Sequence, residues 1–186
     1  MAIEQPRYTV LQREGNFELR RYEPYIVAEI EVRASFEKAG NTAFRPLANY
    51  IFGENRRSEK MEMTAPVTQT PKGEKIGMTA PVTQSGGSDG LYTVSFVMPS
   101  RYKLATLPAP MDERIHFREV PSAVKAAWTY RGGWSQARYA KEEKALRAAM
   151  VKAKRTAMGP PVWARYNAPF WPSFLRRNEI LVEVRP

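Results

Sequence analysis

Few residue types in this chain of 186 residues can perform nucleophilic, redox or metal chemistry. Cysteine is absent, which excludes disulfides, thiolate metal sites and a cysteine nucleophile. His116 is the single histidine, so one chain cannot build a site that needs two. No nucleophile has a base beside it in sequence, and no cluster has metal-ligand spacing. We therefore expect a protein that is not an enzyme and has no protein-bound metal site of its own.

A duplicated motif is the strongest local signal. Residues 63–69 and 78–84 both read Met-Thr-Ala-Pro-Val-Thr-Gln. The turn-forming run 70–74 separates the copies, which predicts two similar strands joined by a loop. The simplest interpretation is that Met63 and Met78 pack into a core, with the prolines at strand edges or bulges.

Hydrophobic periodicity predicts a mixture of strands and two helices. Apolar spacings of three and four predict a helix between Ser35 and Gly53, which either bends at Pro46 or begins at a Thr42 cap. A second helix is predicted over 135–154. The first three strands are expected to form an antiparallel meander. Strands are predicted at 8–12, 17–22, 25–32, 92–98, 115–120, 123–130, 162–166 and 179–184.

A weak internal repeat appears when the chain is shifted by 98 positions. Leu19 and Ile26 then meet Phe117 and Val124, and the two predicted helices coincide. We therefore expect a single α+β domain over residues 1–186, with two pseudo-symmetric halves whose sheets close together and one outer helix per half. A cleft is expected between the halves.

Composition indicates a globular, basic protein. Hydrophobic residues make up 43% of the chain, and Lys plus Arg exceeds Asp plus Glu by 29 to 19. A formal net charge of +10 favours anionic partners such as nucleic acid, anionic lipid or a carboxylate-bearing small molecule. No nucleic-acid-binding module is recognisable, so no nucleic-acid partner is expected. Without a signal segment or an apolar stretch of ~18 residues, we expect a cytoplasmic protein with no membrane span, and a monomer.

Several separate motifs resemble the SOUL family of heme-binding proteins, in family order over residues 8–184. They are Ile51-Phe52-Gly53, the second Met-Thr-Ala-Pro-Val copy at 78–82, Phe96-Val97-Met98-Pro99, Arg118-Glu119-Val120-Pro121 and Arg176-Arg177-Asn178-Glu179. The resemblance implies an α+β fold, a distorted antiparallel β-barrel of two similar halves flanked by two helices and related to bacterial effector-binding domains. It also implies that a tetrapyrrole is held in a hydrophobic surface cleft.

The resemblance further implies which residues line this cleft: those of the first helix and of the segment leading into the Met-Thr-x-Pro-Val motif. The corresponding residues are Leu47, Tyr50, Ile51, Arg56, Lys60, Met61, Met63 and Met78. Cations such as Arg56 and Lys60 can pair with heme propionates. Because the motif is duplicated, either copy can occupy the family position.

The chain departs from some family members at the axial ligand. Where they carry a histidine, this sequence has Arg21, and arginine is a poor iron ligand. His116 alternates with Ile115 and Phe117, which predicts a surface histidine. We therefore predict non-covalent heme binding without a histidine ligand, while methionine and tyrosine ligands stay open.

The functional prediction is reversible binding of heme or a related tetrapyrrole, for carriage, buffering or sensing. Two alternatives stay open: an effector-binding-like module for another small apolar anion, and an enzyme acting on such a ligand. The loop before Glu179 also has two interpretations. It forms either a wall of the cleft or a packed corner in which Glu179 pairs with an arginine.

Overall fold

The computed structural model describes residues 4–56, 73–86, 89–167 and 170–185. The helices are α1 (Phe36–Phe52) and α2 (Gln136–Lys152), with short 3-10 turns η1 (Leu104–Thr106) and η2 (Ser173–Leu175). The strands are β1 (Tyr8–Glu14), β2 (Phe17–Tyr22), β3 (Tyr25–Arg33), β4 (Asn55–Arg56), β5 (Val82–Gly86), β6 (Leu91–Val97), β7 (Ala109–Pro110), β8 (His116–Val120), β9 (Ala123–Arg131), β10 (Val162–Arg165) and β11 (Arg177–Glu183).

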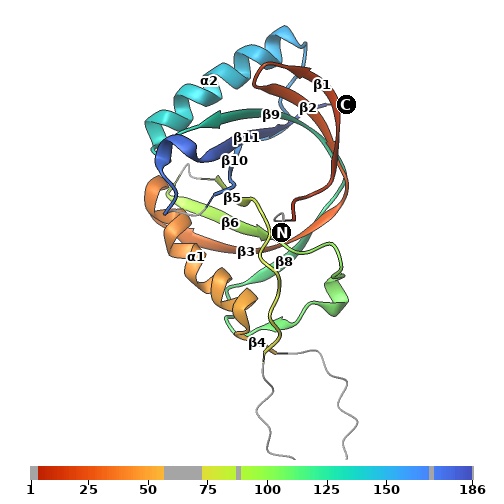
Figure 1. Cartoon of the computed structure of the whole chain (residues 1–186), viewed down its shortest axis with the longest axis vertical. Coiled ribbons are helices and arrows are strands. Elements are labelled where there is room, and N and C mark those ends of the chain that lie inside the picture. Colours follow the sequence, from red (N-terminus) through yellow and green to blue (C-terminus); the bar gives the residue numbers. More distant parts are fainter. Residues whose placement is uncertain (1–3, 57–72, 87–88, 168–169, 186) are drawn as a thin grey trace, which may run out of the picture.

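Nine strands form one antiparallel sheet that curls round on itself (Figure 1), in the order β1-β2-β9-β11-β10-β5-β6-β3-β8. Without β1, this order has an internal symmetry. Exchanging β2 with β8, β3 with β9, β5 with β10 and β6 with β11 gives the same order read backwards. This symmetry confirms the two-halved α+β fold. The halves share one sheet rather than two, because β5 and β10 pair directly, with Thr83 opposite Ala164.

The expected opening meander is wrong beyond its first hairpin. β1 and β2 pair, but β2 then pairs with β9, where Leu19 lies opposite Ala126. β3 lies between β6 and β8, and Ala28 is opposite both Phe96 and Phe117. The two halves thus exchange strands at β2–β9 and β3–β8, whereas β5–β6 and β10–β11 are pairs of consecutive strands. Local patterning carries no information about such partners.

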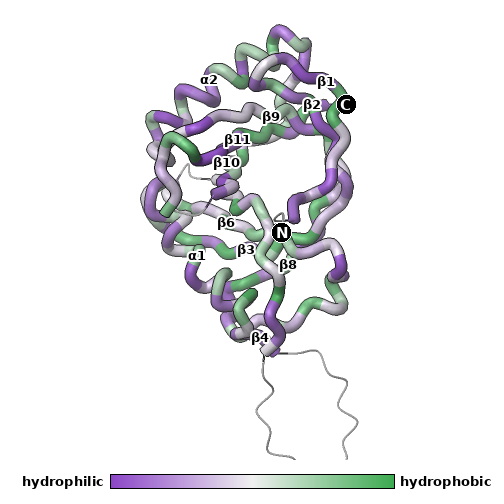
Figure 2. Tube along the Cα trace, in the orientation of Figure 1, coloured by the Kyte–Doolittle hydropathy of each residue, from purple (hydrophilic) through white to green (hydrophobic). Residues whose placement is uncertain are grey.

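Both helices cover the outer face of the curled sheet (Figure 1), α1 against β3 and β6, and α2 against β9 and β11. α1 begins after Ser35 and ends at Gly53, whose φ of 117° suits glycine. Pro46 lies inside this helix, so the alternative start at Thr42 is wrong. Along α2, hydrophilic and hydrophobic residues alternate (Figure 2), in keeping with a single buried face.

Side chains of β11 alternate between the helix-covered face and the inside of the curl. Ile180 packs in the main core, whereas Glu179 points inward and is 0% exposed. Its carboxylate accepts two hydrogen bonds from Arg20, at 2.8 and 2.9 Å, and one from Arg177 at 2.7 Å. The predicted pairing of Glu179 with an arginine is therefore confirmed, whereas the loop before it is not a packed corner, since Phe170 and Phe174 are 86% and 70% exposed.

Candidate functional site

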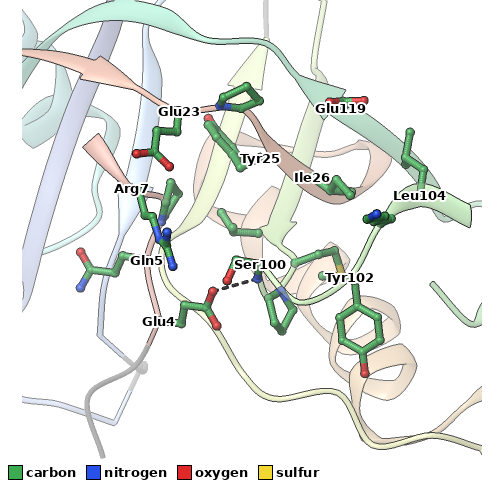
Figure 3. Close-up of a pocket in the computed structure, with 16 residues that line it drawn as sticks. Glu4, Gln5, Arg7, Glu23, Tyr25, Ile26, Ser100, Tyr102, Leu104 and Glu119 are labelled. Atoms are coloured by element: carbon green, nitrogen blue, oxygen red, sulfur yellow. Dashed lines mark hydrogen bonds between the residues drawn. The ribbon is translucent and has the colours of Figure 1, made fainter. Parts of the chain in front are cut away.

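A cavity of about 570 Å³ opens where the N-terminal segment meets the turn between β2 and β3 and the segment after β6 (Figure 3). Its volume lies within the ~300–1,000 Å³ usual for small-molecule sites. The walls are formed by residues 4–7, 23–26, 97–100, 102–104 and Glu119. Both halves of the chain contribute to it: residues 4–7, 23–26 and 97–98 come from the first half, and 99–100, 102–104 and Glu119 from the second.

The inner wall of the cavity is apolar and continuous with the main core. Ile26 and Met98 line the cavity, and Met98 is 4% exposed. Met98 belongs to the same packed cluster as Leu47, Tyr50 and Ile51 of α1. The cavity therefore backs onto the core beneath α1, with two aromatic rings, those of Tyr25 and Tyr102, at its sides.

Charged groups surround this apolar wall. Ser100 N–H donates to the Glu4 carboxylate at 2.8 Å, and hydrogen bonding from Ser100 is the main cause that lowers the pKa of Glu4. Because carboxylates outnumber cations in the cavity, a ligand carboxylate must be held by direct contact with a cation rather than by the net field. The charged lining residues are Glu4, Glu23, Glu119, Arg7 and Lys103.

The second copy of the duplicated motif runs beside the cavity. Glu4 forms a bridge with Thr79, and Ala80 N–H donates to the Glu4 carbonyl at 2.9 Å. The Thr79 hydroxyl donates to the Val97 carbonyl. Met78 is 46% exposed, so its predicted packing into the core is wrong. The first copy, at 63–69, lies outside the described residues.

The predicted cleft residues of α1 are buried. Leu47, Tyr50 and Ile51 are 0%, 1% and 2% exposed, and they fill the core against the sheet. Arg56 is exposed in β4. Lys60, Met61 and Met63 lie outside the described residues. Among the described residues, only Arg56 and Met78 of the predicted set thus present substantial surface.

Tyr50 also borders a smaller hollow of about 230 Å³ between α1 and the segment before β8. Its hydroxyl donates to the Pro108 carbonyl at 3.0 Å, and burial raises the pKa of Tyr50, so the phenol stays protonated at neutral pH. Arg114 lines this hollow but pairs with Asp112 at 2.6 Å. The hollow is smaller than the cavity, and it is lined by two cations, the paired Arg114 and the exposed Arg45.

His116 is exposed on β8 and lies opposite Glu29 of β3, which confirms the predicted surface position. It is not among the residues that line the cavity. Within the described part of the chain, no group of three or more His, Asp or Glu side chains is placed to hold a metal ion. The same part contains no helix long and apolar enough to cross a membrane.

Most of the lining residues were not singled out from the sequence, among them Arg7, Tyr25, Tyr102 and Lys103. Tyr25 begins β3, and the other three come from irregular segments, where periodicity gives no signal. The run 96–99, which carries part of the resemblance to the family, was one available signal for the cavity. Val97, Met98 and Pro99 of this run line it.

The fold and the cavity define a class: α+β proteins with a curled antiparallel sheet, two outer helices and a cavity of small-molecule size. A family model described as SOUL heme-binding protein matches residues 3–183. The chain therefore belongs to the SOUL heme-binding protein family.

Individual relatives agree with this assignment. The chain is 26% identical over 168 residues to human heme-binding protein 2, a match covering 88% of this chain and 75% of that protein. Its fold is similar to that of the EcmrR C-terminal domain, with a TM-score of 0.65, 11% identity and coverage of 96% and 98% of the two chains. A hydrolase from Listeria innocua gives a TM-score of 0.59 at 10% identity, covering 94% of each chain. These two structures show the fold alone.

Proposed function

We propose that this chain binds heme or a related tetrapyrrole reversibly and non-covalently in the 570 Å³ cavity. The family match over residues 3–183 is the observation that carries the proposal. The apolar wall at Ile26 and Met98 and the exposed Leu104 support it, since a flat macrocycle needs apolar contact on its faces. Arg7 and Lys103 are the cations that would meet the propionates.

The proposed site uses no histidine ligand, because the one histidine lies outside the cavity lining. A site of this kind holds its ligand by shape and by contacts to the propionates. It therefore releases the ligand more readily than a site in which a side chain coordinates the iron. Reversible carriage, buffering or sensing by a monomer fits such a site better than catalysis does. The proposal includes no nucleic-acid partner.

The predicted residues near α1 define a competing location for the same ligand. Tyr50 borders the smaller hollow, Arg56 is exposed in β4 shortly after α1, and Met78 is exposed next to Thr79, which bridges to Glu4. Because Arg56 and Met78 do not line the cavity, substitutions can separate the two locations.

We predict that Leu104→Asp weakens binding of both ferric heme and iron-free protoporphyrin by about tenfold or more, because it places a carboxylate against the apolar ring. Leu104 is 43% exposed, so the variant should fold. The measurement is a titration followed by Soret absorbance and tryptophan quenching. Val151→Asp, at a position 77% exposed on α2, is the matched control and should bind normally.

The same titration distinguishes the alternatives. If Arg56→Glu weakens binding and Leu104→Asp does not, the ligand lies beside α1 instead. If His116→Ala weakens binding of heme but not of protoporphyrin, a histidine ligand is present and that part of the proposal fails. If neither porphyrin saturates the protein, tetrapyrrole binding itself is wrong for this chain.

A further inference from the structure

The loop between β10 and β11 exposes an unusual amount of apolar surface. Its side chains Phe170, Trp171, Phe174 and Leu175 are 86%, 44%, 70% and 41% exposed. We call these four residues the aromatic loop. Large apolar side chains that are clustered in a short exposed segment mark a surface for interaction with another protein or with a membrane.

The backbone of the aromatic loop is held in place, which leaves the rings pointing away from the core. Arg176 Nε donates to the Trp171 carbonyl at 2.8 Å, and Arg131 donates to the Leu175 carbonyl at 2.9 Å. The Asn167 side chain accepts from Arg177 N–H at 2.7 Å. The exposure is therefore a property of an anchored loop, which is hydrogen-bonded to Arg131 at the end of β9.

The surroundings of the aromatic loop are cationic. Arg131 is exposed beside it, and Arg138 donates to the Arg131 carbonyl at 3.2 Å. Arg176 and Arg177 directly follow the loop; Arg177 pairs with Glu179 at 2.7 Å, and the Arg176 guanidinium lies over the Trp134 ring. Two carboxylates lie on the flank: Glu142 pairs with Arg138 at 2.9 Å, and Glu37 accepts from the backbone of Gln136. Apolar rings within a positive field thus define this surface.

We propose that the aromatic loop binds the surface of anionic lipid bilayers. Aromatic side chains favour the boundary between headgroups and acyl chains, where their rings are buried and polar edges stay wet. Arginines at the base of the loop would meet lipid phosphates and be attracted by the negative surface potential. This contact goes beyond the proposed tetrapyrrole binding, because no residue of the aromatic loop lines the cavity.

Single-stranded nucleic acid also pairs aromatic rings with cations, but it requires a groove that follows the strand. No residue of the aromatic loop lines the 570 Å³ cavity or the 230 Å³ hollow. A projecting apolar loop fits a bilayer interface better than it fits a strand of nucleic acid.

The test is cosedimentation of the full chain with vesicles of phosphatidylcholine alone or mixed with phosphatidylglycerol. We expect binding to the mixed vesicles that weakens as salt rises. The double variant Phe170→Ser/Phe174→Ser should lose about tenfold or more of this binding, since it removes the two most exposed rings. Arg131→Gln should weaken it by about fivefold, on the anionic vesicles only.

A matched control replaces two other exposed apolar side chains, which lie outside the aromatic loop. Val151 and Met158 are 77% and 58% exposed, and Val151→Ser/Met158→Ser should bind vesicles as the parent does. Addition of mixed vesicles should also shift tryptophan emission to the blue, and Trp171→Phe should remove this shift. Each variant should keep the parent's unfolding midpoint and its porphyrin titration.

Three results would overturn the proposal. The first is equal vesicle binding by the parent and by Phe170→Ser/Phe174→Ser. The second is an equal loss in the Val151→Ser/Met158→Ser control, which would show non-specific adsorption. The third is absence of vesicle binding together with loop-dependent binding of an oligonucleotide, which would assign the surface to nucleic acid. Failure of porphyrin binding would leave all three readouts unaffected.

Discussion

Replacing Glu179 by glutamine is expected to lower the free energy of unfolding by about 3–5 kcal/mol. The Glu179 carboxylate is 0% exposed, and it holds the guanidinium of Arg20, itself 1% exposed, by two hydrogen bonds. The Tyr166 and Thr129 hydroxyls donate to the same carboxylate at 2.7 and 3.0 Å. Glutamine cannot ionise, so Arg20 would lose its principal buried counter-charge. Urea denaturation monitored by circular dichroism measures the loss.

The double variant Arg20→Met/Glu179→Leu is the control for this explanation. Removing both charges leaves neither ion without a partner, so the double variant should be more stable than Glu179→Gln. A loss below about 1 kcal/mol in Glu179→Gln would show that the ion pair is solvated, contrary to the burial described above.

The same carboxylate makes the free energy of unfolding depend on pH in the acidic range. Burial by itself would raise the pKa of Glu179, but the hydrogen bonds and charge of Arg20, with hydrogen bonds from Tyr166 and Arg177, lower it from 4.5 to about 2. Because the folded-state pKa is the lower one, this stabilisation is complete above about pH 4.5 and is lost as the pH falls towards 2. Glu179→Gln should flatten this part of the stability profile.

Leu47→Asp is expected to unfold the protein. Leu47 is 0% exposed in the core under α1, and aspartate there would leave both a cavity and an unpaired carboxylate. The expected loss is about 5 kcal/mol or more, similar to the whole stability of a typical domain. Far-ultraviolet circular dichroism and urea denaturation report this directly.

Two controls use the same helix. Leu47→Met keeps an apolar side chain of similar volume, so it should lower the free energy of unfolding by less than about 1.5 kcal/mol. Phe52→Asp places the same carboxylate at a position 58% exposed, and should leave the protein folded. A Leu47→Asp variant that folds normally but no longer binds porphyrin would instead place Leu47 against the ligand, as the resemblance to the family implies.

Several parts of the fold could be predicted from the sequence because they depend on near neighbours. The limits of β2 match the prediction, and α1 runs from Ser35 to Gly53, because apolar spacing and the glycine cap are local signals. The shift of 98 positions predicted the symmetry of the sheet, since matched residues such as Leu19 and Phe117 fall on strands related by the exchange of halves. The pairing of Glu179 with an arginine follows from the cost of burying a lone charge.

Only the tertiary structure decided which elements meet. Periodicity shows which face of a strand is buried but not which strand covers it, so the pairing of β2 with β9 was hidden. Met78 has the residue type of a core side chain, yet its segment runs along the surface beside Glu4. The cavity likewise depends on Arg7, Tyr25 and Lys103, which come from separate segments. The amino-acid sequence by itself therefore determined the elements, the symmetry and the family, whereas the long-range contacts decided where a ligand can enter, because a cavity exists only between segments that folding brings together.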